Sequence, residues 1–428
     1  MDIKRNLVQI GRQAKILLKN GFAHIFAGTF LNKAVTMLSS IVIARLVDKQ
    51  QYAYLSYSDT IYGYLALFSG LGMGSALLKI CAGKSEKKQD CAYLSYAIKC
   101  GMIFEIFVSI IFVGIFLIIK IPFPQARHYI VISVFYPVMY CIYDLLICYI
   151  RAKSFNKQYA CVNLIYSILI CIFSVVFVLI WNADGLIYAR YLALSFMLIY
   201  VCCFVFLFLG KTSYFKLSVN QKRNFWKIAI TLVIANAFSG MMPFNENMLL
   251  SHIIADEVIL ANYRVAGLFP QMILLITQAV NIYFFPIAAG MDNEGIGITK
   301  FGIKVGLLNA AMVIIGMIGG ILFTPIFLPH FYGKKYSDAV GISLGLWIMR
   351  GMNAGIRMVP MNMLIAIGKY RFNLKMSVFT FVIQIIVDWI FIIQWGGHGM
   401  VFGTIFIYLI TGILYWTAFI HASSSKFD

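Results

Sequence analysis

The chain has 428 residues, of which 61% are hydrophobic and only 12% are charged, and this composition excludes an ordinary soluble domain. Its formal net charge of +19 does not point to nucleic acid, because the basic residues are spread over short polar segments between long apolar ones. We therefore expect an integral membrane protein without a nucleic-acid partner.

The first segment, 1–20, is basic and contains no cleavable signal peptide. Apolar residues from Ile3 to Leu18 recur at helical spacing, which favours an amphipathic helix on the inner leaflet of the membrane. A basic tail without helical structure is the alternative.

Long apolar runs follow, and they predict membrane-spanning helices. The stretches 104–119 and 166–181 are too long and too poor in charge for buried helices of a soluble protein, and they lack the alternation of barrel strands. About twelve segments approach the roughly twenty residues that a helix needs to cross a bilayer. In chain order they are 22–44, 52–78, 93–119, 129–150, 158–181, 185–209, 225–254, 260–289, 301–328, 339–366, 372–395 and 399–421.

The longest polar interruption of this series, 209–224, lies at the midpoint of the chain. It predicts an amino-terminal lobe at 1–210, which contains the amphipathic segment and six spans. The carboxy-terminal lobe is expected at 211–428, with the linker and the other six spans.

The two halves also resemble each other in detail. The stretch FVLIWNADGLIYARYLAL aligns with FIIQWGGHGMVFGTIFIY, which places Trp181 over Trp395 and Gly185 over Gly399. A second match relates the second spans of the two halves. Because six spans precede the repeat, both halves enter the membrane from the same side, as in parallel transporter repeats. We expect an all-α integral membrane fold with two six-helix lobes, related by a parallel pseudo-two-fold axis and facing a central cavity.

Basic residues are distributed unequally between the two sides of the membrane. With the amino terminus inside, the predicted cytoplasmic segments hold about 21 lysines and arginines, and the opposite segments hold about six. The positive-inside rule therefore predicts a multi-pass protein with both termini in the cytoplasm.

A glycine-rich stretch in the second span, FSGLGMGSAL at 68–77, differs from a phosphate-binding loop. Its Gly70, Gly72 and Gly74 have the wrong spacing and lie in the middle of a predicted span. Close packing of helices explains these glycines better.

Charged residues also lie inside the predicted spans. A charge at the centre of a bilayer costs roughly 2.5 to 3.5 kcal/mol even on a lenient scale, so these side chains should point inward. Ion pairs between helices are one explanation, for example between Asp144 and Arg357 or between Glu246 and Arg264; contact with a substrate is the other. The basic residues are Lys33, Arg190, Arg264, Lys304, Arg350 and Arg357, and the acids are Asp59, Glu105, Asp144, Glu246 and Asp388.

Arg350 and Arg357 are seven residues apart, so a regular helix would place them on one face at a separation of about 10 Å. Asn353 lies on the same face, whereas Gly351 and Gly355 form a small-residue pair that allows a neighbouring helix to approach. A series of cationic side chains through a membrane cavity suits an anionic substrate. Arginine in particular suits phosphate, because its planar guanidinium donates paired hydrogen bonds.

Catalytic and metal-binding patterns are not visible in the sequence. The nine cysteines form no pair with metal-ligand spacing, and the six histidines are scattered. We therefore expect no enzyme activity, no metal and no cofactor.

Residues 37–79, MLSSIVIARLVDKQQYAYLSYSDTIYGYLALFSGLGMGSALLK, resemble the opening helical hairpin of the Wzx-type polysaccharide flippases. These belong to the multidrug/oligosaccharidyl-lipid/polysaccharide exporter superfamily. NENMLLSHIIADEVILANYRVAGL at 245–268 is similar to the seventh span and following turn of that family. PMNMLIAIGKYRFNLKM and GGHGMVFGTIFIYLITG look like its closing spans. The chain departs from the family pattern where VDKQQYAY lacks the turn glycine and proline, and where Glu246 and Asn247 replace an aspartate and a basic residue.

The resemblance implies translocation of an undecaprenyl-pyrophosphate-linked oligosaccharide, an O-antigen or capsular repeat unit, from the inner to the outer leaflet by alternating access. Such a flippase works in lipopolysaccharide or capsule biosynthesis in the cytoplasmic (inner) membrane. Its partners are membrane lipids and the lipid-linked oligosaccharide, with the polysaccharide polymerase machinery as a further candidate. The coupling ion would be a proton or sodium. The expected substrate-binding residues are Lys33, Arg190, Arg264, Lys304, Arg350, Arg357, Asn353 and Asn32, and the expected coupling or gating acids are Asp59, Glu105, Asp144, Glu246 and Asp388.

Two alternatives remain open. A cation-coupled multidrug antiporter of the same superfamily often carries cationic substrates, so acids should dominate its cavity. An integral-membrane polysaccharide polymerase or glycosyltransferase would need a larger soluble loop or a surface cluster of carboxylates.

Overall fold

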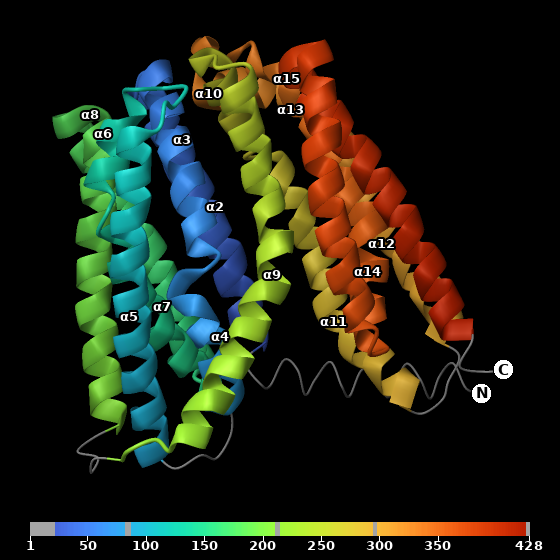
Figure 1. The fold of residues 1–428 in the computed structure, drawn as a ribbon. Coiled ribbons are helices and arrows are strands. Elements are labelled where there is room, and N and C mark those ends of the chain that lie inside the picture. The colour runs from blue at the N-terminus through green and yellow to red at the C-terminus, as the bar shows by residue number, and fades with distance from the viewer. Residues whose placement is uncertain (1–21, 82–86, 210–214, 294–297, 425–428) are drawn as a thin grey trace. The chain divides into compact units, whose positions relative to one another are not determined.

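The computed structural model describes residues 22–81, 87–209, 215–293 and 298–424, and these ranges are almost wholly helical and contain no strand (Figure 1). The amphipathic helix expected at 1–20 lies outside the described residues. The chain forms two compact units, Met1–Ala237 and Phe238–Asp428, which divide within helix α9. The lobe boundary expected at 210/211 stays a prediction.

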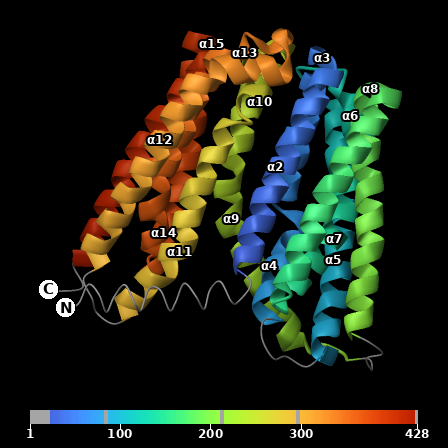
Figure 2. The same ribbon diagram turned by 180° about the vertical axis from the view of Figure 1, so that it is seen from behind.

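Unit 1 is a bundle of long helices. Helix α2 packs along α8, and α7 packs against both α5 and α8 (Figure 2). Large apolar residues such as Leu145, Met197 and Phe225 fill the core between them. The elements are α2 (Phe22–Leu46), α3 (Lys49–Ala66), the 3₁₀ turn η1 (Ser69–Gly72), α4 (Met73–Ile80), α5 (Lys87–Ile118), α6 (Ala126–Ile132), α7 (Tyr136–Ala152), α8 (Asn156–Leu209) and the first part of α9 (Val219–Ile253).

Unit 2 contains the same kinds of element. Its core lies between α11, α12, α14 and α15 and includes Val305, Met363 and Phe419. The elements are the end of α9, α10 (Glu257–Ala266), the 3₁₀ turn η2 (Pro270–Met272), α11 (Ile273–Asn293), α12 (Ile298–Tyr332), the 3₁₀ turn η3 (Lys334–Tyr336), α13 (Ala339–Met352), the π-helix η4 (Asn353–Arg357), α14 (Met358–Ala366) and α15 (Tyr370–Ser424).

The order of elements repeats between the two units. The series α2 to α8 and the series α9 to α15 each have a long first helix, a second span interrupted by a 3₁₀ turn, a long third helix, a fourth span made of two pieces, and a final helix of more than fifty residues. The breaks in the two final helices coincide at the aligned tryptophans. Trp181 and Asn182 have φ/ψ of −120°/18° and 50°/−132°, and Trp395 and Gly396 have −129°/16° and 56°/−136°. The predicted internal repeat is therefore confirmed.

Each final helix reverses direction at its break. In α8, the rings of Phe173 and Phe196 lie 5.9 Å apart, although a straight helix would separate residues 23 apart by about 35 Å. In α15, Phe391 and Phe406 come within 6.4 Å in the same way. The predicted junctions between spans 181/185 and 395/399 are therefore tight helical hairpins.

Glycine is required beside each reversal. A Cβ atom at Gly185 would lie 2.1 Å from the carbonyl oxygen of Phe177, and one at Gly399 would lie 1.9 Å from that of Phe391. No side chain can occupy that space, so both halves of the sequence need glycine at this position of the repeat.

The number of spans agrees with the prediction once these hairpins are recognised. Within the described ranges, six helices are long and apolar enough to cross a membrane, or seven if the bent pair α6 and α7 is one span. Two of the six, α8 and α15, each contribute two crossings. Helices α2 and α9 and the α13–α14 segment are also long enough to cross, and counting them by length alone gives the twelve crossings expected of this all-α membrane protein.

The glycine-rich stretch of the second span forms the break between α3 and α4. Gly70, Leu71 and Gly72 all have left-handed φ angles, and a Cβ at Gly72 would lie 2.5 Å from the carbonyl oxygen of Ala229 on α9. Close packing is confirmed, and the stretch also interrupts the helix, which the prediction did not include.

Candidate functional site

Arg350 is the centre of a buried polar cluster in unit 2. It lies in the last turn of α13 and is 6% exposed, and its guanidinium faces Glu246 of α9, which is 1% exposed. The Nη2–Oε2 distance is 2.8 Å and the Nη1–Oε1 distance is 3.3 Å, so the two planar groups pair in parallel. Tyr263 of α10 donates a hydrogen bond of 2.8 Å to the same carboxylate. The cluster therefore joins three helices.

The pairing of Glu246 with Arg350 corrects the ion pair between Glu246 and Arg264 that the sequence suggested. The structure pairs Glu246 with Arg350 and not with Arg264. Arg264 is half-buried on α10. The sequence predicted the wrong partner for Glu246. The rotation of α9 about its axis decides the partner, and a span of nearly uniform hydrophobicity does not reveal that rotation.

Arg357 is equally buried but has a different environment. It is 6% exposed and lies at the end of the π-helix η4. Its Nη1 donates to Asn353 Oδ1 at 3.2 Å, its Nη2 approaches Met242 Sδ at 3.9 Å, and its guanidinium lies 5.5 and 5.7 Å from the ring centres of Tyr408 and Tyr415. Within the described residues of unit 2, no ion pair joins Arg357 to a carboxylate.

Buried cations are usually neutralised by a carboxylate, because an isolated buried charge costs several kcal/mol. In Arg357 the cation is held by an amide oxygen, a thioether and two aromatic faces, while its Nε has no hydrogen-bond partner. This guanidinium therefore retains unused capacity to bind an anion.

The π-helix separates the two arginines. A π-helix leaves a carbonyl outside the regular ladder, and here the carbonyl of Ala354 accepts from Thr277 Oγ1 at 3.1 Å and from Asn309 Nδ2 at 2.8 Å. Both arginines still contact α9, one through Glu246 and the other through Met242. The predicted separation of about 10 Å between Arg350 and Arg357 assumed regular α-helical hydrogen bonds. The π-helix η4 widens that hydrogen-bond pattern between the two residues.

The expected packing role of Gly351 and Gly355 is confirmed. Cβ atoms at these positions would lie 2.7 Å from Met317 Sδ and 3.4 Å from Val313 Cγ1, both on α12. Helix α12 thus approaches the side of the π-helix that does not carry the arginines.

Asp388 is a second buried carboxylate in unit 2. It is fully buried in the first arm of α15, and Thr404 of the second arm donates to its two oxygens at 3.2 Å. Gln384 lies beside it, and Glu246 is close enough to interact electrostatically. No ion pair joins Asp388 to a base among the described residues of unit 2.

Unit 1 has a separate polar site between α3 and α8. Arg190 and Asp59 form a two-pronged ion pair with distances of 2.5 and 2.9 Å. They line a cavity of about 410 Å³ together with several tyrosines, of which Tyr136 and Tyr166 are hydrogen bonded to each other at 3.0 Å. A charged pair among tyrosine rings and hydroxyls can bind polar, ring-shaped groups.

The remaining predicted residues do not join these clusters. Glu105 is buried and accepts the amide N–H of Gly70 at 2.9 Å, so it stabilises the break between α3 and α4. Asn32 accepts a hydrogen bond from Ser167 across α2 and α8. Lys33 and Lys304 are exposed, and neither forms an ion pair among the described residues of its own unit.

Asp144 is half-buried beside Cys148 in unit 1. Its suggested partner Arg357 belongs to unit 2, so the pair Asp144–Arg357 stays a prediction.

The structure adds residues that the sequence did not single out. Tyr263, Tyr408 and Tyr415 contact the arginine cluster, and Thr404 binds Asp388. Across the described ranges, no group of three or more histidine, cysteine, aspartate or glutamate side chains is placed to hold a metal ion.

Comparison with solved structures places this fold among transporters. The chain superimposes on a multidrug resistance MATE family transporter of the MOP superfamily in its inward-facing conformation, with a TM-score of 0.77, 13% identity, and coverage of 92% of this chain and 95% of the other. The same transporter type in its outward-facing conformation gives a TM-score of 0.64 at 13% identity, covering 96% and 95%. A MATE protein in complex with Br-NRF gives 0.63 at 12% identity, covering 96% of both chains.

The fold, the apolar helices and these neighbours define a multi-pass membrane protein with a transporter fold. A search of curated proteins finds no match. A family model described as polysaccharide biosynthesis protein matches residues 17–290. The chain belongs to this polysaccharide biosynthesis and flippase family, which confirms the resemblance drawn from its motifs and indicates a transporter rather than an enzyme.

Proposed function

We propose that the protein is a flippase that moves an undecaprenyl-pyrophosphate-linked oligosaccharide, an O-antigen or capsular repeat unit, from the inner to the outer leaflet of the cytoplasmic membrane. The observation that carries the proposal is the buried Arg357, which has no carboxylate partner in the described part of unit 2. A pyrophosphate would supply the missing negative charge, and the planar guanidinium can hold two of its oxygens.

Arg350 and Arg357 have different roles in this proposal. Arg350 is neutralised by Glu246, so it shapes the site and contributes a smaller part of the attraction for an anion. Arg357 makes the main phosphate contact, with Asn353 holding the guanidinium from one side and tyrosine rings supporting it from another. Within unit 1, the tyrosine-lined cavity at Asp59 and Arg190 is proposed as a separate place that can accept sugar rings during transport.

The remaining predicted residues have roles in the same transport cycle. Lys33, Lys304, Arg264 and Asn32 would guide the anionic headgroup, and Glu105 and Asp144 would act as gating acids. The large excess of basic residues in the predicted inner segments supports an orientation with both termini in the cytoplasm. Alternating access between two conformations then carries the headgroup across.

The test is transport of lipid-linked oligosaccharide into the outer leaflet of reconstituted vesicles, read from the fraction of glycan that an external lectin can bind. We expect Arg357→Ala to reduce the rate at least tenfold and Arg357→Lys to recover only part of it, because lysine keeps the charge but loses the paired geometry. Arg371→Ala, which removes an exposed arginine of α15, is the matched control and should transport normally. Normal transport by Arg357→Ala would contradict the proposal.

A cationic-drug efflux assay on the same vesicles separates the flippase from a multidrug antiporter. A guanidinium without a carboxylate repels cations, so we expect no efflux that depends on Arg357. Efflux of cationic drugs with no glycan transport would favour the antiporter.

A further inference from the structure

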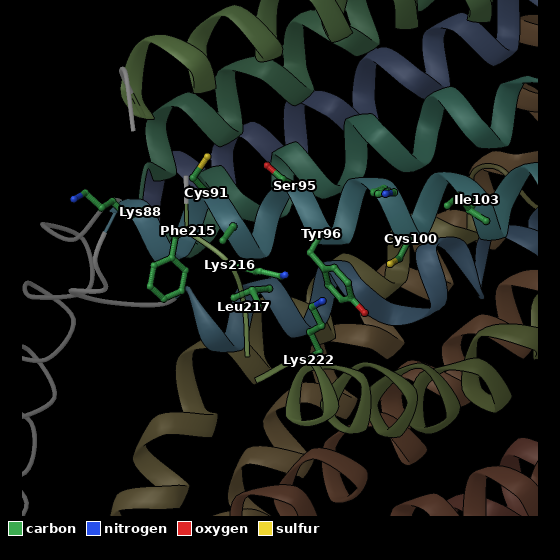
Figure 3. A pocket seen from close by; sticks show the side chains of 12 residues that line it. Lys88, Cys91, Ser95, Tyr96, Cys100, Ile103, Phe215, Lys216, Leu217 and Lys222 are labelled. Atoms are coloured by element: carbon green, nitrogen blue, oxygen red, sulfur yellow. The ribbon is translucent and has the colours of Figure 1, made fainter. Parts of the chain in front are cut away.

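A second cavity of about 710 Å³ opens in unit 1, apart from the residues assigned to the transport site (Figure 3). It lies between the first turns of α5 and the segment that leads into α9. Four lysines and no acid are among the residues that line it: Lys88 and Lys99 on α5, Lys216 before α9 and Lys222 in its first turn. The cavity is therefore complementary to a negatively charged ligand.

The lysines approach the cavity from two elements. The ammonium group of Lys222 lies 5.3 Å from the ring centre of Tyr96, and Figure 3 shows Lys216 and Lys222 pointing toward that ring, whereas Lys88 points away at the outer end. Tyr96 is fixed in turn, because its hydroxyl accepts a hydrogen bond of 2.9 Å from Trp226 Nε1. Two ammonium groups thus converge on a rigid aromatic platform.

One face of α5 continues from this cavity into an apolar stripe. The lining positions Cys91, Ser95, Lys99 and Ile103 recur at intervals of four residues, so they lie on one side of the helix. The same side carries on into exposed large apolar residues, namely Ile106, Phe107 and Ile110.

The length of α5 places these two regions at different depths. Its 32 residues extend about 48 Å, which exceeds the roughly 30 Å of hydrocarbon in a bilayer. The basic first turns therefore reach the headgroup layer, while the stripe from Ile103 onward faces the acyl chains. A ligand that fits both must carry a phosphate and a long apolar tail.

We propose that this cavity binds an anionic membrane phospholipid, with its phosphate at Lys99, Lys216 and Lys222 and an acyl chain along the apolar stripe of α5. Basic pockets between membrane helices favour such headgroups. The bound lipid would connect α5 to residues 215–222 at the start of α9. The proposal does not depend on the transported substrate, because none of the predicted transport residues lines the cavity.

The test uses the full chain in a neutral detergent and counts lipid adducts by native mass spectrometry. We expect one phosphatidylglycerol to bind more tightly than phosphatidylcholine. The triple variant Lys99→Ala/Lys216→Ala/Lys222→Ala should weaken that binding about a hundredfold, because each basic residue near an anionic headgroup contributes roughly fivefold. The matched control Arg223→Ala/Lys227→Ala removes two exposed cations of the same α9 that do not line the cavity, and it should bind normally.

A charge-preserving variant, the binding of the alanine variant and two displacement experiments decide whether the cavity is a phospholipid site. The triple arginine variant at the same positions keeps the charge and should keep the lipid, which also shows that the fold tolerates these changes. Equal binding of phosphatidylglycerol by the wild type and the triple alanine variant would overturn the proposal. Displacement of the lipid by millimolar inorganic phosphate would show a free-phosphate site. Preferential displacement by a polyprenyl pyrophosphate would show a substrate-entry site. Either result would also overturn the proposal of a phospholipid site.

Discussion

The buried pair between Arg350 and Glu246 makes a prediction about single residues. Glu246→Gln removes the negative charge and leaves a buried guanidinium without compensation, which destabilises proteins by about 3 to 5 kcal/mol. We expect a clearly lower thermal unfolding temperature in detergent. The measurement is a double-mutant cycle with Arg350→Gln.

In that cycle, the double variant Glu246→Gln/Arg350→Gln should recover much of the loss, because two neutral amides can hydrogen bond to each other. Additive losses in the double variant would show that the two side chains act independently. Arg371→Gln, at an exposed position, should leave the unfolding temperature unchanged.

Asp388 makes a second prediction at this scale. Asp59 and Glu246 are engaged by arginines, whereas Asp388 is held by Thr404 and can exchange a proton or bind sodium without breaking an ion pair. We propose Asp388 as the main coupling acid and expect Asp388→Asn to abolish the dependence of transport on an imposed ion gradient. Flux in vesicles with proton or sodium gradients measures this, and an unchanged gradient dependence would exclude the role.

The sequence identified the charges of this cluster but not their arrangement. Arg350, Arg357, Glu246 and Asp388 are conspicuous because charges are rare in apolar spans. The pairing of these charged side chains depends on the rotation of α9 and on the π-helix. Neither feature changes the hydrophobic periodicity of the sequence. The tyrosines of the cluster could not be selected from the 25 in the chain, since tyrosine also occurs throughout the apolar core.

At the scale of elements, the two helical hairpins depend on one glycine each. Gly185→Ala and Gly399→Ala both place a methyl group about 2 Å from a backbone carbonyl oxygen, as the Cβ distances of 2.1 and 1.9 Å show. Overpacking of this kind typically costs about 1 to 3 kcal/mol. We expect both variants to unfold at lower temperature, or to accumulate less in the membrane.

The control for these variants is Gly114→Ala in α5, where a Cβ would meet nothing within 4 Å. This change should be neutral or stabilise the helix by up to about 1 kcal/mol, because alanine is the better helix former. If Gly185→Ala and Gly399→Ala behave like Gly114→Ala, the tight reversal described for α8 and α15 is incorrect.

Element by element, the sequence predicted more of the fold than of the site. The junctions near Trp181 and Trp395 follow from hydrophobic length and from the internal repeat. At Gly70 and Gly72 the sequence predicts close packing within an unbroken span, because the flanks are apolar on both sides, whereas the structure has a break there. The π-helix was missed because a single widened turn does not alter the hydrophobic pattern, although Pro360 nearby removes one helical hydrogen bond.

At the scale of the whole molecule, the predicted orientation can be tested by labelling. In a background without the nine native cysteines, Lys120→Cys is predicted to face outward and Lys369→Cys to face the cytoplasm. An impermeant maleimide added to intact cells should therefore label residue 120 and should label residue 369 only after the cells are opened. The reverse pattern would invert the proposed orientation.

The abrupt reversals within α8 and α15 also bear on how the protein is made. Between Lys157 and Arg190, and between Lys375 and Lys426, the sequence carries no lysine or arginine, so the turn itself holds no positive charge to anchor it. The two arms of each hairpin therefore lie against each other with no basic loop between them. No positively charged segment holds either turn on one side of the membrane, so each hairpin can enter the bilayer as one unit.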